Sequence, residues 1–137
     1  MTDRRLEPWG IVTAKLRLSN PRDSSRGPIE VGALADTGSV FLCVPQHVYL
    51  QLGLDVLQER EVKLADGSCV CVPYVGPVLV QFKNRTGVMG ALVLGDEVLL
   101  GAIPMEDMDL VVNPPDRTVD VNPASPNIAS GIAKRAA

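Results

Sequence analysis

The chain has 137 residues and a mass of 14.6 kDa, which suits one compact domain and is too short for the roughly 250 residues of an α/β barrel. Hydrophobic residues make up 46% of the sequence, so the chain can bury a core and does not have the composition of a disordered protein. Its net charge of −3 provides no basic field for a phosphate backbone, and we therefore expect no nucleic-acid partner.

The first half of the chain is predicted to form short strands separated by exposed turns. Apolar and charged residues alternate over 11–18, as in a half-buried strand. The polar stretch 19–28 predicts an exposed loop, and a second strand is predicted over 29–34. A buried strand is predicted over 40–44, and the apolar spacing after it predicts a short helix over 47–52.

The second half continues this pattern of short strands. Asp66-Gly67 lies between two alternating runs, 61–64 and 68–72, and predicts a projecting β-hairpin because both residues tolerate a positive φ. The tip of that hairpin is expected at Ala65-Asp66-Gly67. The strands predicted beyond it are 75–82, 88–94, 98–100 and 118–121.

The chain is predicted to end with a short helix, one strand and a tail. A helix over 104–110 would have Pro104 at its first position, which places Glu106 and Asp107 near the positive end of the helix dipole. Residues 124–137 are small and include proline, so we expect a tail outside a domain formed by residues 1–123. The predicted fold class is all-β, with one short C-terminal helix.

One carboxylate stands out because it follows an apolar strand directly, in the run Ala35-Asp36-Thr37-Gly38-Ser39. Burying a carboxylate is costly unless hydrogen bonds or a second group compensate for it. Taken alone, Asp36-Thr37-Gly38 therefore indicates either a β-turn or a functional site.

The surrounding segments favour the functional site. The run GALADTGSVFLCVP, the Asp-Gly hairpin after it, and LLGAIPMEDMDLVVNP with its closing RTVDVNP together resemble the single-domain, retropepsin-like aspartic proteases of clan AA, of the bacterial cytoplasmic type. The resemblance covers roughly residues 11–123 and implies a closed β-barrel half-domain. It also implies that Leu99-Leu100-Gly101 threads behind the Asp-Thr-Gly loop, and that the hairpin forms a flap over the substrate.

The resemblance implies an aspartic endopeptidase that acts on a peptide or an unfolded protein without a cofactor or metal. Asp36 would activate the water, Thr37 would hydrogen-bond across a twofold axis, and Gly38 would allow close approach of the substrate. The Ser39 hydroxyl would donate to Asp36. The residues implied to bind substrate are Ser39, Ala65, Asp66, Gly67 and Ser68.

The same resemblance implies a homodimer. The mechanism uses two carboxylates that share one proton, whereas this chain holds one Asp-Thr-Gly, so two copies of Asp36 would meet on a twofold axis. Ala102 follows Gly101 where retroviral members have Arg or Asn, so their dimer-locking ion pairs need not exist here. The alternative function is a catalytically silent protease-like module for dimerisation or peptide binding.

The cysteines and acidic residues support weaker alternatives. Cys43, His47, Cys69 and Cys71 could supply four zinc ligands, or Cys43 and His47 a nucleophile and its base, but buried free cysteine is ordinary core material. Glu106, Asp107 and Asp109, with Asp96 and Glu97 nearby, could hold a divalent cation, although a helix N-terminus explains Glu106 and Asp107 without one. An odd cysteine count and a polar start at 1–7 predict a cytoplasmic protein, and no apolar run reaches membrane-spanning length.

Overall fold

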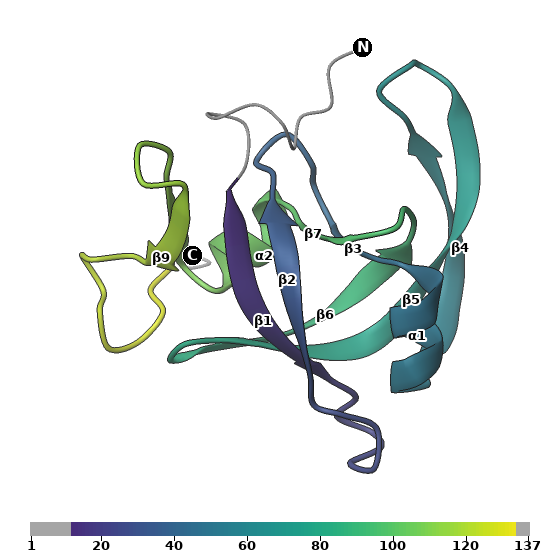
Figure 1. The fold of residues 1–137 in the computed structure, drawn as a ribbon, viewed down its shortest axis with the longest axis horizontal. Coiled ribbons are helices and arrows are strands. Elements are labelled where there is room, and N and C mark those ends of the chain that lie inside the picture. The colour runs from purple at the N-terminus through teal and green to yellow at the C-terminus, as the bar shows by residue number, and fades with distance from the viewer. Residues whose placement is uncertain (1–11, 134–137) are drawn as a thin grey trace, which may run out of the picture.

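The computed structural model describes residues 12–133, and about half of these residues lie in β-strands (Figure 1). No helix in this range has the length and apolar character that crossing a bilayer requires. The elements are β1 (Thr13–Ser19), β2 (Ile29–Ala35), β3 (Leu42–Val44), α1 (Gln46–Leu52), β4 (Asp55–Lys63), β5 (Cys69–Phe82), β6 (Arg85–Val93), β7 (Val98–Leu100), α2 (Ala102–Asp107), β8 (Leu110–Asn113) and β9 (Thr118–Val121).

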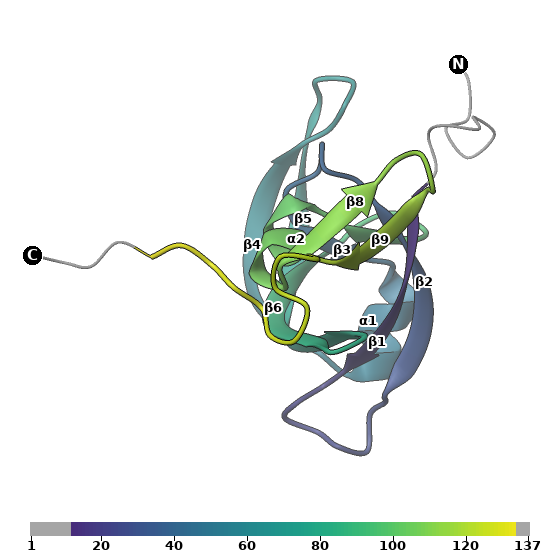
Figure 2. The ribbon, with the colours of Figure 1, turned by 90° about the vertical axis from the view of Figure 1, so that its left-hand side faces the viewer.

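Six of the strands close into a barrel, and a closed β-barrel is what the resemblance implied. Their order is β5-β6-β3-β7-β2-β1, and β1 pairs with β5 to complete the ring. Neighbours in the ring are antiparallel except β2–β7 and β3–β6, which are parallel. The β4–β5 hairpin projects beyond the barrel (Figure 1), and the β8–β9 hairpin lies beside β1 (Figure 2).

The barrel interior is filled by the apolar faces of alternating strands. In β1, Leu16 and Leu18 are buried while Lys15 and Arg17 are exposed, which confirms the predicted period of two. Val75, Val78 and Val80 of β5 and Leu42 and Val44 of β3 belong to the same core. The same cluster also contains Val48 and Leu52 of α1 and Met105 and Met108 at the end near α2.

The β4–β5 hairpin is longer than predicted. β4 begins at Asp55, so Val56 lies on a strand and does not continue the helical spacing of α1. β5 is one strand of 14 residues where two were predicted, because Pro73 is accommodated in a stretch that pairs with β4 through Glu59. A register shift between Val75 and Val78 against β6 bends β5 where it passes from the hairpin into the barrel.

The second helix starts earlier than predicted and ends sooner. α2 begins at Ala102 after the N-cap Gly101, so Pro104 is its third residue and Glu106 and Asp107 lie at its end. The predicted interaction of these carboxylates with the positive end of the helix dipole is therefore wrong. Leu110, assigned to the helix from the sequence, instead opens strand β8, which pairs with β9.

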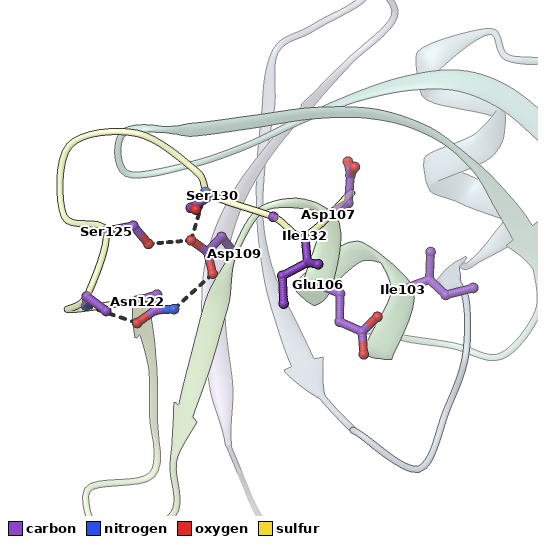
Figure 3. A pocket seen from close by; sticks show the side chains of 10 residues that line it. Ile103, Glu106, Asp107, Asp109, Asn122, Ser125, Ser130 and Ile132 are labelled. Carbon is purple, nitrogen blue, oxygen red and sulfur yellow. Dashed lines mark hydrogen bonds between the residues drawn. The ribbon is translucent and has the colours of Figure 1, made fainter. Parts of the chain in front are cut away.

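The segment after β9 lies outside the hydrophobic core but is fixed to the domain (Figure 3). Asp109 accepts hydrogen bonds from the Asn122 side-chain amide (3.0 Å), the Ser125 hydroxyl and the Ser130 backbone N–H (2.9 Å). The buried Arg85 donates to the Ser125 carbonyl and lies 3.8 Å from the Asp109 carboxylate. This anchoring continues beyond residue 124, the predicted start of the tail.

The anchoring of Asp109 predicts an acid-sensitive contribution to stability. Hydrogen bonds, first from Ser125 and then from Asn122 and Ser130, lower the pKa of Asp109 to about 2. Because the folded-state pKa is depressed, this contribution is present at neutral pH and is lost as the pH falls through about 2. We expect Asp109→Asn to lower the melting temperature at neutral pH, with a deficit that shrinks on acidification.

Thermal unfolding of both proteins between about pH 7 and pH 2 measures this deficit. Asp116→Asn is the matched control, since Asp116 is exposed and accepts a hydrogen bond from the side chain of the nearby Asn113 in the β8–β9 turn. A deficit that is constant across the pH range, or equal in the two variants, would contradict the prediction.

Candidate active site

Asp36 directly follows β2, at one end of the barrel, and a short loop holds it there. Its backbone N–H donates to the Leu100 carbonyl (3.0 Å), and its own carbonyl accepts from the Ser39 N–H (3.1 Å). The Gly38 N–H donates to Oδ1 of Asp36 (2.9 Å). Asp36 is half-buried, whereas Thr37 and Gly38 are exposed. The Gly38 N–H therefore holds one carboxylate oxygen of Asp36 in place, and the two residues that follow Asp36 face the solvent.

Strand β7 passes between β2 and β3, behind this loop. Leu99 is the parallel partner of Leu34 in β2 and the antiparallel partner of Cys43 in β3. The two strands that the Asp36 loop connects are therefore held apart by a third strand. This is the threading that the resemblance implied for Leu99-Leu100-Gly101.

Gly101 is the point of closest approach between this strand and the loop. A Cβ there would lie 2.5 Å from the Phe41 carbonyl oxygen, a backbone atom that cannot move aside easily. Immediately after it, the Ala102 N–H donates to the Ser39 carbonyl (2.7 Å) and the Ile103 N–H to the Val40 carbonyl (3.0 Å). The loop thus supplies acceptors for the first N–H groups of α2.

Ser39 takes part in the site through its backbone. Its N–H donates to the Asp36 carbonyl and its own carbonyl accepts from the Ala102 N–H, so Ser39 connects the Asp36 loop to α2. The hydrogen bond from its hydroxyl to Asp36, which the resemblance implies, stays a prediction.

The tip of the β4–β5 hairpin is a three-residue loop, Ala65-Asp66-Gly67. The Gly67 N–H donates to the Leu64 carbonyl (3.0 Å), and the Leu64 N–H donates to the Ser68 carbonyl (2.8 Å). Gly67 alone has a positive φ, of 88°, so the expected turn with two such residues is wrong. The Ser68 hydroxyl and N–H bond to Asp66 and lower the pKa of its carboxyl.

A cavity of about 410 Å³ lies between the Asp36 loop and this hairpin. Of the predicted site residues it brings together Gly38, Ser39 and Ala65. The predicted residues that do not line it are Asp36, Thr37, Asp66, Gly67 and Ser68. Most of its wall is formed by residues that were not predicted from the sequence: Val40, Phe41, Cys43, Glu61, Val62, Lys63, Leu64, Leu92, Leu94 and Leu99. Charged and apolar residues alternate from Glu61 to Leu64, and this pattern could have indicated in the sequence that Val62 and Leu64 share one face of the hairpin.

An aromatic cluster that the sequence did not reveal fixes the base of the hairpin. The Arg60 guanidinium lies 3.9 Å from the Tyr74 ring centroid and 5.0 Å from that of Phe41. The two rings meet edge to face at 6.4 Å. Tyr74 also packs over Gly90, where a Cβ would lie 2.1 Å from its ring. The hairpin is therefore anchored at its base, and its exposed tip contacts little else.

The structure does not bring the candidate zinc ligands together. Cys43 is buried in β3, whereas Cys69 and Cys71 are exposed on the hairpin and His47 is exposed on α1. Residues 12–133 contain no group of three or more His, Cys, Asp or Glu side chains placed to hold a metal ion. Burial raises the pKa of the Cys43 thiol, which disfavours the thiolate that a nucleophile requires.

No protein-family model and no curated protein matches this chain. The function must therefore be argued from the site itself, which combines a carboxylate on a braced loop, a cavity and an overhanging hairpin.

Proposed function

We propose that the protein is one half of a retropepsin-like aspartic endopeptidase, whose active site forms when two copies bring their Asp36 carboxylates together. One observation carries the proposal: Asp36 directly follows β2 on a loop braced by a strand that passes between β2 and β3, and Gly38 and Ser39 of this loop line a cavity under a hairpin. A surface β-turn would need neither the bracing strand nor the cavity.

The chemistry follows from two carboxylates that share one proton. The ionised Asp36 removes a proton from water as the water oxygen bonds to the peptide carbonyl carbon, and the partner's Asp36 donates its proton to the carbonyl oxygen. The tetrahedral intermediate collapses when its C–N bond breaks and a proton passes to the amine nitrogen. Each turnover consumes one water and returns the shared proton.

Gly38 suits this role because it leaves the carboxylate uncovered. A Cβ at this position would lie 3.1 Å from Oδ1 of Asp36, on the oxygen that accepts the Gly38 N–H. The substrate would bind as an extended strand in the cavity between this loop and the hairpin, where backbone hydrogen bonds can hold it.

Exposed apolar side chains beside the loop support the homodimer. Val40 and Ile103 are about half exposed, at 50% and 52%, and their backbones are hydrogen-bonded to each other. Together with the exposed Thr37, they form the surface next to Asp36 that a second copy would cover on a twofold axis.

The direct test is hydrolysis of an unfolded protein at about pH 4 to 7 by wild type, Asp36→Asn and the control Asp116→Asn. We expect activity in the wild type and the control and none in Asp36→Asn. Equal turnover by wild type and Asp36→Asn would overturn the protease proposal. Peptide binding without any turnover would instead support the silent binding module.

The hairpin tip provides a separate test of the flap. Gly67 has a φ of 88°, so Gly67→Ala strains the tip by about 1 kcal/mol, yet a Cβ there meets no atom within 4 Å. We expect kcat/KM to fall several-fold, while the strain of about 1 kcal/mol lowers the melting temperature by only a few degrees. Steady-state kinetics and thermal unfolding measure the two effects, and an unchanged kcat/KM would count against the flap role.

A further inference from the structure

The projecting part of the β4–β5 hairpin begins where β5 leaves the barrel (Figure 1). Tyr74 pairs with Leu92 of β6 and is the last residue of β5, in the direction of the hairpin tip, that does so. From Pro73 to the tip, β5 pairs only with β4 among the described strands. Arg60, the partner of Val72, therefore lies on the projecting side of this boundary.

The Arg60 side chain reaches back across the boundary. Its guanidinium carbon lies 3.9 Å from the Tyr74 ring centroid and 5.0 Å from that of Phe41. Phe41 belongs to the segment that connects Asp36 to β3. Since a cation is attracted to the negative face of an aromatic ring, this contact joins the hairpin directly to the segment that carries the candidate catalytic residue.

Gln58, on the same strand as Arg60, also holds the guanidinium. In the amide orientation that satisfies both groups, the Gln58 side-chain oxygen accepts hydrogen bonds from Nη2 (3.1 Å) and Nε (3.3 Å) of Arg60. In the part of the chain that the structure describes, no carboxylate forms an ion pair with Arg60. The two rings are therefore the partners of its positive charge.

This contact relates two walls of the cavity under the hairpin. Phe41 lines the cavity on the side of the Asp36 loop, and residues 61–65 line it on the side of the hairpin. Arg60 directly precedes the hairpin wall but does not line the cavity itself. The Asp36 loop is braced separately by β7. A change at Arg60 should thus move the hairpin wall and leave the candidate catalytic carboxylate in place.

We propose that Arg60 is a positioning residue, which sets the width of the substrate cavity by tying the hairpin to Phe41 and Tyr74. This inference rests on the proposed endopeptidase function and adds the residue that controls how the hairpin closes over a bound peptide. Val62 and Val70 also pack onto the apolar cluster at the hairpin base, so the hairpin still forms without Arg60. Loss of the cation shifts the balance between closed and open hairpin roughly fivefold, as expected for one cation–π contact.

The first test compares the steady-state kinetics of wild type, Arg60→Met and Arg60→Lys on fluorescein-labelled casein, an unfolded protein. We expect Arg60→Met to raise KM roughly fivefold with little change in kcat, because Asp36 keeps its place. Arg60→Lys keeps a cation without the planar guanidinium, so its KM should lie between the other two. Arg17→Met is the control, since Arg17 is exposed on β1 and does not line the cavity. An unchanged KM in Arg60→Met, or a loss confined to kcat, overturns the inference.

The second test needs no cleavage and uses the Asp36→Asn background. Hydrogen exchange of backbone amides 61–72 should quicken several-fold in Arg60→Met, while exchange in β1 stays unchanged and shows that the barrel is folded. Fluorescence anisotropy of the labelled casein should show a matching loss of affinity. Unchanged exchange in the hairpin, or faster exchange without a loss of casein affinity, overturns the role of Arg60. If exchange and affinity change as expected but casein cleavage does not depend on Asp36, the endopeptidase proposal fails and the positioning role stands.

Discussion

A one-to-one mixture of wild-type and Asp36→Asn chains, allowed to exchange subunits, is expected to keep about a quarter of the activity of the same total amount of wild type. Random pairing places two intact Asp36 residues in only one dimer of every four. A dimer with one carboxylate and one amide cannot share the proton that activates water, and we expect its rate to fall about a thousandfold.

The measurement is the initial rate on an unfolded protein as the fraction of Asp36→Asn rises at constant total protein. A site shared by two chains gives a curve that falls as the square of the wild-type fraction, whereas a site contained in one chain gives a straight line. Mixtures with Asp116→Asn should show no decrease. A straight line with Asp36→Asn would refute the shared site while leaving catalysis by Asp36 itself intact.

Gly101→Ala is expected to cost about 3 kcal/mol of unfolding free energy and to abolish activity. The added Cβ would lie 2.5 Å from the Phe41 carbonyl oxygen and 2.7 Å from the Val40 carbonyl carbon. Both are backbone atoms of the segment that connects Asp36 to β3. Relief of this clash must separate β7 from the loop. The Ala102 N–H would then lose its bond to Ser39, and Asp36 would lose its fixed position.

Chemical denaturation gives the free energy, and hydrolysis of the unfolded substrate gives the activity. Gly32→Ala is the matched control, because Gly32 lies on exposed β2 backbone without a positive φ, and a Cβ there meets no atom within 4 Å. We expect this control to be as stable as wild type or slightly more so. If Gly101→Ala unfolds at the same denaturant concentration as the control, the close approach of β7 does not brace the loop.

The strands and the position of Asp36 could be predicted from the sequence because their signals are local. Alternation in β1, the glycine at Gly67 and the apolar run before Asp36 each depend on residues within a few positions. α1 was also predicted, and it ends at Gly53, whose φ of 59° is left-handed.

The errors arise where distant segments decide the structure. α2 begins at Ala102 because carbonyl groups of the Asp36 loop accept its first N–H bonds, and nothing within the helix sequence shows this. Arg85 is buried although it follows a polar turn, because two residues far from it in the sequence bind its guanidinium. The Ser125 carbonyl accepts a hydrogen bond from it, and the Asp109 carboxylate forms an ion pair with it. The cavity under the hairpin likewise joins residues of β3, β6 and β7 with β4, and these strands meet only once the barrel closes.

The position of β7 also constrains when the Asp36 loop can form during folding. Ala33 pairs with Val98 and Ala35 with Leu100, so the loop is closed by a segment made long after Asp36 itself. Contacts so far apart in the chain carry a large loop-closure entropy and form late. A nascent or truncated chain that stops before Val98 would hold Asp36 on an unbraced loop, so the proposed protease would become active only after almost the whole domain had been synthesised and folded.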